Sequence, residues 1–168
     1  MKVIALLFST MFFFQGCSYA ISPGLAGKAD KTISFEKVQA DPDSFKGKII
    51  IIGGTIAQAS EVNRGTLLEV TQKPLDYWGK PEATRRTGGR FLVFHAGPLN
   101  TMAYAAGVDI TIAGEVLGTG SPIVGGKQYD YPVLLAKEIK LWEREPGSRD
   151  KARWMDPLSD SPRSGRPE

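Results

Sequence analysis

The chain has 168 residues, a formal net charge of +3, one histidine and one cysteine. A single cysteine excludes an internal disulfide. A charge so close to zero argues against a nucleic-acid-binding protein, which needs a strongly basic face. This length suits one domain with short flanking segments.

An apolar run opens the chain, from Val3 to Phe14, and Lys2 precedes it. As a helix the run would span about 18 Å, which is short of the roughly 30 Å hydrocarbon core of a bilayer. A basic start followed by a short apolar stretch is typical of a secretory signal peptide, so we expect residues 1–16 to be removed. The alternative is a buried first element of a cytosolic protein.

Cys17 directly follows Gly16 at the end of this run. An exported chain that keeps one unpaired thiol beside its cleavage zone favours a covalently capped sulfur. Gly16 and Cys17 resemble the end of a bacterial lipobox, where cleavage before the cysteine leaves it acylated at the mature N-terminus. Phe14 and Gln15 depart from the usual leucine and small residue. Ordinary cleavage after Ala20 is the alternative, and it would discard the cysteine.

The lipoprotein interpretation carries expectations about location. Each buried methylene contributes about 0.8 kcal/mol, so two or more acyl chains make a firm anchor. Ser18, in place of aspartate, resembles lipoproteins sorted to the outer membrane in enteric-type bacteria. We therefore expect palmitate-type acylation of Cys17 and a periplasm-facing position on the outer membrane. The expected partners are outer-membrane lipid and the lipoprotein processing and sorting machinery.

The first part of the mature chain predicts a tether and then folded elements. Residues 17–33 have no periodicity and predict a lipidated tether. Ser34 is a candidate N-cap for a short helix that ends at Asp41–Pro42. Residues 48–60, KIIIIGGTIAQAS, predict a β-branched strand. The Gly53–Gly54 pair suits a strand that bends sharply or carries a bulge.

Two further strands and a long loop follow. Residues 66–72, TLLEVTQ, predict a second strand after a turn, and residues 91–95, FLVFH, predict a third. The loop between them is rich in glycine, proline and arginine, and long loops in compact domains are often functional. Residues 99–107 predict a short helix that Gly107 ends.

The last strands complete an all-β pattern. In residues 108–116 apolar side chains alternate with Asp109, Thr111 and Glu115, which predicts a strand with one solvated face. Residues 131–142 predict a final strand, although the stretch around 137–140 is also compatible with a helix.

The chain order predicts an OB-like five-stranded barrel with short helices over residues 34–145. A β-sandwich is the competing architecture. Residues 146–168 are proline-rich and charged with few apolar side chains, so they predict a disordered tail.

The sequence offers little for catalysis. His95 is the only histidine, and it lies at a strand end with no acid nearby in sequence, so a hydrolase built on it is a minor alternative. Gly118–Lys127 resembles a phosphate-binding loop but has Gly126 where the motif needs lysine. We predict no catalytic residues, no metal site and no cofactor.

Aromatic and basic side chains gather in the loop from Asp76 to Arg90. Such a mixture can contact an anionic glycan, an oligonucleotide or lipid headgroups. The candidate ligand-contact residues are Tyr77, Trp78, Arg85, Arg86 and Arg90.

Several longer stretches carry a family resemblance. PLDYWGKP (Pro74–Pro81) and YDYPV (Tyr129–Val133) are the most specific, together with GGRFLVFHAG and KLW. Over about residues 34–142 the chain resembles the Slp-type, starvation-inducible outer-membrane lipoproteins; the arginine- and proline-rich tail departs from them. The resemblance implies a small barrel tethered to the outer membrane, without enzymatic activity, acting as a binding or structural module of the envelope.

Overall fold

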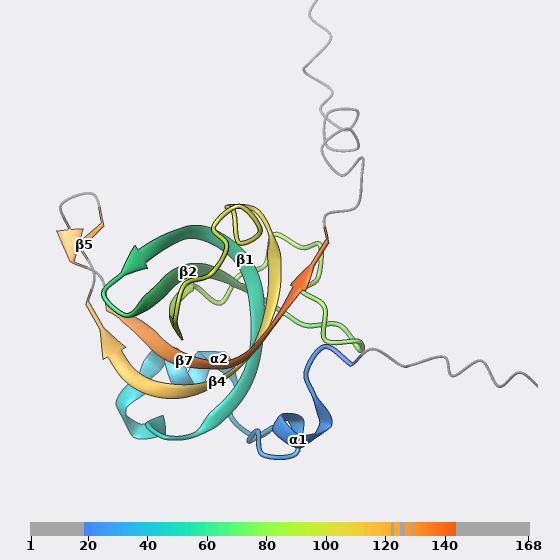
Figure 1. The fold of residues 1–168 in the computed structure, drawn as a ribbon. Coiled ribbons are helices and arrows are strands. Elements are labelled where there is room, and N and C mark those ends of the chain that lie inside the picture. Colours follow the sequence, from blue (N-terminus) through green and yellow to red (C-terminus); the bar gives the residue numbers. More distant parts are fainter. Residues whose placement is uncertain (1–18, 122, 125–126, 129, 144–168) are drawn as a thin grey trace, which may run out of the picture.

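The computed structural model describes residues 19–121, 123–124, 127–128 and 130–143 (Figure 1). The predicted signal peptide, Cys17 and the predicted tail at 146–168 lie outside these residues. In the part described, no helix is long and apolar enough to cross a membrane.

Five strands close into a barrel in the order β1-β2-β3-β7-β4 (Figure 1). β3 and β7 pair in parallel, and the other neighbouring pairs of the barrel are antiparallel. The predicted all-β barrel is confirmed, and the sandwich is excluded because each of the five strands pairs with two neighbours, so that one sheet closes on itself. The strands are β1 (Ile49–Val62), β2 (Gly65–Lys73), β3 (Arg90–Ala96), β4 (Asp109–Gly120) and β7 (Tyr131–Trp142). Two short strands, β5 (Ile123–Val124) and β6 (Lys127–Gln128), pair between β4 and β7.

Alternating apolar residues of the five strands fill the interior. A helix completes this core: α2 (Phe35–Ala40) adds Phe35 and Val38 to the same buried cluster. The Phe35 ring lies 5.6 Å from that of Phe91 on β3. Ser34 precedes α2 in an extended conformation and the helix ends before Asp41, as predicted. A 3-10 helix, η1 (Pro42–Phe45), then leads into β1.

The glycine pair of β1 lies where this strand pairs on both sides. Gly53 is opposite Lys73 of β2 and Thr111 of β4, and the β1–β2 register shifts just beyond, between Ile56 and Gln58. A Cβ on Gly54 would come within 3.0 Å of the Thr71 backbone. β2 thus approaches β1 so closely at Gly54 that a side chain would have no room, which explains why glycine occupies this position.

The helix predicted at residues 99–107 is wrong, because this segment consists of turns between β3 and β4. The Asn100 side chain accepts a hydrogen bond from the Met102 backbone at 3.0 Å. Gly107, with φ of 83°, donates to the Ile56 carbonyl of β1 at 2.7 Å. Backbone groups that a helix would pair internally are thus used by a local turn and by the barrel.

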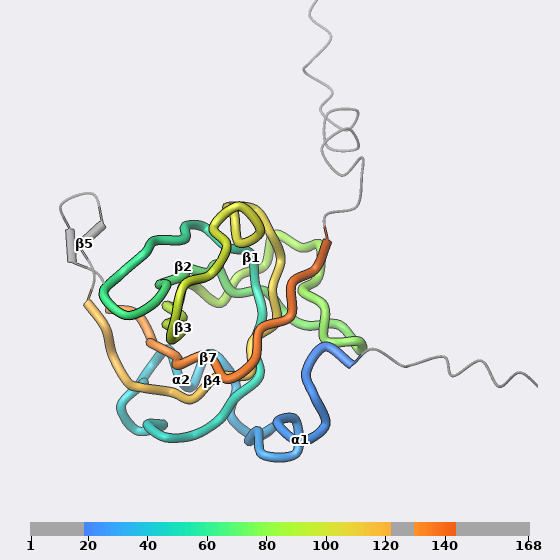
Figure 2. The backbone as a smooth tube through the Cα atoms, viewed as in Figure 1, coloured from blue at the N-terminus to red at the C-terminus, as the bar shows by residue number. Residues whose placement is uncertain are grey.

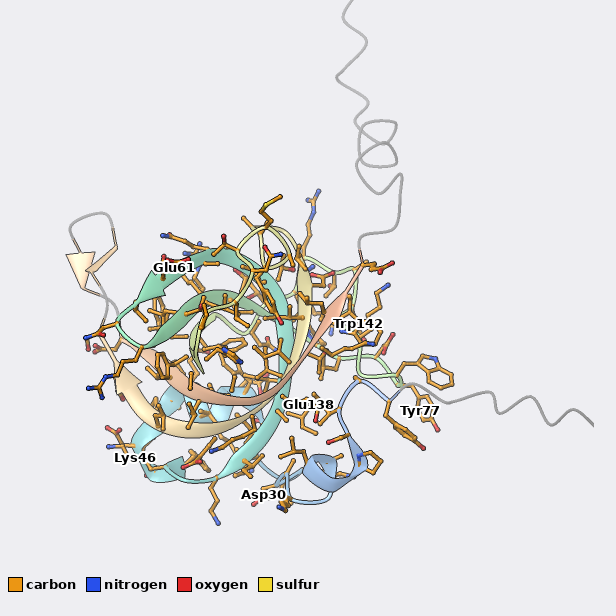
Figure 3. The ribbon with its side chains drawn as sticks, in the orientation of Figure 1. Asp30, Lys46, Glu61, Tyr77, Glu138 and Trp142 are labelled. Carbon is orange, nitrogen blue, oxygen red and sulfur yellow. The ribbon has the colours of Figure 1, made fainter. Side chains whose placement is uncertain are left out.

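The described part of the predicted tether packs against the barrel. Ala20 and Ile21 are buried, and α1 (Pro23–Ala26) follows them. The Ser22 amide and hydroxyl donate to the two Glu138 carboxylate oxygens of β7, at 2.9 and 2.7 Å. Figure 3 shows Glu138 on the side of the barrel next to α1. Residues 20–22 are therefore held against the domain.

Candidate functional site

The loop between β2 and β3 begins with a tight hairpin at residues 75–81, here called the aromatic hairpin. The backbone of Asp76 pairs with the Lys80 carbonyl, and its carboxylate accepts from the amides of Trp78 and Lys80 at 2.9 and 2.8 Å. Gly79 has φ of 79°, a left-handed conformation that favours glycine. These bonds close the turn and expose the two residues after Asp76.

Two large aromatic side chains occupy the tip of the aromatic hairpin. Tyr77 is 93% exposed and Trp78 is 67% exposed. Their rings lie edge to face, with centroids 5.3 Å apart. Figure 3 shows Tyr77 pointing away from the barrel. Exposing this much aromatic surface loses the free energy that burial would provide, so the pair is a candidate contact surface.

The base of the aromatic hairpin is bonded to the barrel through Thr111 of β4. The Thr111 hydroxyl donates to the Gly79 carbonyl at 2.5 Å and accepts from the Trp142 indole N–H at 2.9 Å. Thr111 is fully buried, so the prediction that it faces solvent is wrong. The reason is that the loop after β2 folds over the outer face of β4 and covers it.

The three arginines predicted as ligand contacts have different surroundings. Arg90 Nη1 lies 2.6 Å from Glu69 Oε1, and this bond raises the pKa of the arginine. Arg86 is exposed and lines a hollow beside α2, and Arg85 is exposed. Of the three, Arg90 is thus paired with a carboxylate of β2, and Arg86 belongs to the lining of the hollow.

The hollow beside α2 has a volume of about 700 Å³. Its lining contains three cations and one carboxylate, and the Gly88 amide at its wall donates to the Gln72 side chain at 2.8 Å. Lys31 and Lys73 lie far apart in the sequence, so no sequence motif could have placed them in one hollow. The charged lining residues are Lys31, Lys73, Arg86 and Glu36.

His95 stands at the end of β3, and its ring Nδ1 lies 3.2 Å from the Gly97 carbonyl. Among the residues that the structure describes, no three histidine, cysteine, aspartate or glutamate side chains are grouped so that they could hold a metal ion.

Comparison with known proteins now identifies the family. Residues 14–164 match the model of the Outer membrane lipoprotein Slp family. The chain belongs to this family. The match spans the barrel, the aromatic hairpin and the segment that begins just before Cys17, so the predicted resemblance is confirmed.

Two relatives of this Slp-family chain come from the bacteria Escherichia coli and Haemophilus influenzae. Outer membrane protein Slp of Escherichia coli (strain K12) is 27% identical over 140 residues, covering 82% of this chain and 73% of that protein. An uncharacterized protein of Haemophilus influenzae (strain ATCC 51907 / DSM 11121 / KW20 / Rd) is 26% identical over 145 residues, covering 83% and 76%. Among solved structures, the mitochondrial single-stranded DNA binding protein Rim1 of S. cerevisiae aligns over 61% of this chain and 99% of that one. The identity is 14% and the TM-score 0.37, too low to support an argument about ligands.

Proposed function

We propose that this protein is a non-enzymatic outer-membrane lipoprotein, anchored through acyl groups on Cys17, whose barrel is a periplasmic binding or structural module. The observation that carries the proposal is the Gly16–Cys17 pair after a short apolar run, in a chain with no other cysteine. Membership of a family described as outer membrane lipoproteins supports it. So does the packing of residues 20–22 on the barrel, because it leaves a short stretch between the folded domain and the cysteine.

Cys17→Ser is expected to abolish acylation, because the serine hydroxyl replaces the thiol that accepts the lipid. Intact-mass analysis of the wild-type membrane fraction should give a chain that starts at Cys17 and carries two or more acyl groups. The variant should give a chain without lipid mass, either released or still carrying residues 1–16. Ser18→Ala is the matched control, since it changes the neighbouring residue and keeps the thiol.

A wild-type protein that starts after Ala20 and has no added mass would contradict the proposal, since ordinary signal cleavage would then explain the N-terminus. Fractionation between inner and outer membranes, run on the same samples, tests the location separately.

A second candidate function is binding of an anionic glycan or oligonucleotide at the loop from Asp76 to Arg90. The observation that favours it is the hollow beside α2, where Arg86 of this loop joins Lys31 and Lys73. Lys73 also lies 3.5 Å from Asp109, so part of this positive charge is balanced within the protein.

Arg86→Ala is expected to weaken binding of a sulfated glycan or a short oligothymidine by about tenfold at low salt, the loss of one charge-assisted contact. Affinity should also fall as salt rises. Arg64→Ala is the matched control, because Arg64 is exposed on the β1–β2 turn, away from the hollow. Equal binding by wild type and both variants would reject this second function.

A further inference from the structure

Three exposed aromatic residues lie near the start of the described chain. Tyr19, its first residue, is 73% exposed, and it precedes the buried Ala20. A Cβ placed on Gly79 would lie 2.9 Å from the Ala20 Cβ, so the aromatic hairpin touches the start of the chain. Figure 2 shows the blue start of the described chain beside the light green loop that contains the hairpin. Tyr19, Tyr77 and Trp78 thus share one corner of the molecule.

This corner also lies close to the proposed lipid attachment. Cys17 is two residues before Tyr19, and two extended residues span at most about 7 Å. The inference rests on the proposed acylation of Cys17: the backbone of the acylated residue would lie within about 7 Å of the Tyr19 backbone, so the acyl chains would enter the bilayer near this corner. Ser22 is held by two hydrogen bonds to Glu138, so the barrel cannot swing far from the point of entry.

The chemistry of the corner matches the surface of a bilayer. Tyrosine and tryptophan are enriched at membrane–water interfaces, where the apolar part of the ring and its polar edge are both accommodated. Within the aromatic hairpin the charged residues are Asp76 and Lys80, of opposite sign. The Asp76 carboxylate already accepts two backbone N–H groups, which lowers the cost of bringing it to a headgroup layer. The side chain of Met102 is also exposed, but it lies on the loop between β3 and β4 and not on the aromatic hairpin.

We infer that Tyr19 and the aromatic hairpin form a membrane-contact surface, which rests on the headgroup region of the leaflet that holds the acyl chains. The lipid would hold the chain at the membrane, and the aromatic side chains would set the orientation of the barrel on it. The opposite end of the barrel, marked by Glu61 in Figure 3, then faces the aqueous side.

Spin labels on the full-length acylated protein test this orientation. Because acylation would block the Cys17 thiol, Tyr77→Cys and Glu61→Cys each provide one free thiol for a nitroxide. Both proteins are reconstituted in vesicles of phosphatidylethanolamine and phosphatidylglycerol, and intact mass confirms the acyl groups. We expect the label at 77 to be at least about fivefold less accessible to a water-soluble nickel chelate than the label at 61, as for a side chain about 5–10 Å into the headgroup region.

Equal aqueous accessibility at the two positions, with acylation of Cys17 confirmed, would overturn the membrane contact and leave the proposed lipoprotein function standing. The aromatic corner would then be a surface for a protein or glycan. A mass without acyl groups would overturn both proposals. The two failures are thus distinguished by the mass spectrum.

Trp78, one of three native tryptophans, gives a second measurement that needs no label. In vesicles containing brominated lipid, wild-type tryptophan fluorescence should be quenched, and Trp78→Phe should lose most of this quenching. Trp142 and Trp154 are present in both proteins, so the difference between the two reports Trp78; the Trp142 indole is bonded to Thr111 on the barrel, and Trp154 lies outside the described residues. Quenching that is unchanged by Trp78→Phe would contradict the contact, whereas its loss would support it even if the Tyr77→Cys protein failed to fold.

Discussion

Phe91→Ala is expected to lower the free energy of unfolding by about 3–5 kcal/mol, the usual cost of truncating a fully buried phenylalanine. Phe91 is fully buried on β3 and its ring packs against that of Phe35. Removing the ring leaves a cavity between the barrel and α2, which the surrounding strands cannot close. The measurement is urea unfolding of the wild-type and variant proteins, followed by circular dichroism.

Tyr77→Ala is the matched control for this prediction, because it removes an aromatic ring from a side chain that is 93% exposed. We expect it to change the free energy of unfolding by less than about 0.5 kcal/mol. A loss for Phe91→Ala as small as that for Tyr77→Ala would show that the ring of Phe91 is not part of a packed core. The same control tests whether changes at the aromatic hairpin leave the barrel folded, on which the spin-label experiment depends.

Gly54→Ala is expected to destabilise the barrel by about 3 kcal/mol or more, at the upper end of the cost of overpacking. The added Cβ would meet the carbonyl of Thr71, which is backbone of β2 and cannot rotate away as a side chain would. This clash can be relieved only if β1 and β2 move apart, which weakens the hydrogen bonds between these two strands of the closed barrel. Urea unfolding measures the loss.

Gly24→Ala is the control for Gly54→Ala. A Cβ at Gly24 would meet nothing within 4 Å, and the residue lies in α1. Alanine is preferred over glycine in a helix by about 1 kcal/mol, so this change should be neutral or slightly stabilising. A Gly54→Ala protein as stable as wild type would mean that β1 and β2 approach less closely than the structure shows.

The proposals divide the protein into parts with separate roles. The core around Phe91 and the glycine bend at Gly54 keep the barrel closed. Thr111 holds the aromatic hairpin on the outside of that barrel, and the bonds from Ser22 to Glu138 hold the start of the described chain beside it. If Cys17 is acylated as proposed, this packing would limit how far the barrel can turn relative to the lipid.

The positions of the strands along the chain could be predicted because they depend on local patterns. Alternation of apolar residues, β-branched stretches and turn residues act over a few positions, and all five barrel strands were predicted close to their observed bounds. The helix expected at residues 99–107 failed for a tertiary reason. Its spacing was helical, but the backbone of Gly107 and Val108 pairs with β1 and the preceding residues form turns.

The sequence by itself determined the family, the order of the strands along the chain, the need for glycine in β1, and the unusual position of Cys17. Tertiary structure alone decided which distant residues meet. Thr111 alternates as a solvent-facing residue would, yet the loop after β2 buries it. Lys31 and Lys73 share a hollow with Arg86, and the aromatic hairpin lies beside Tyr19. The physical reason is that local patterns fix which face of a strand is apolar, whereas contacts between segments depend on how the closed barrel carries its loops.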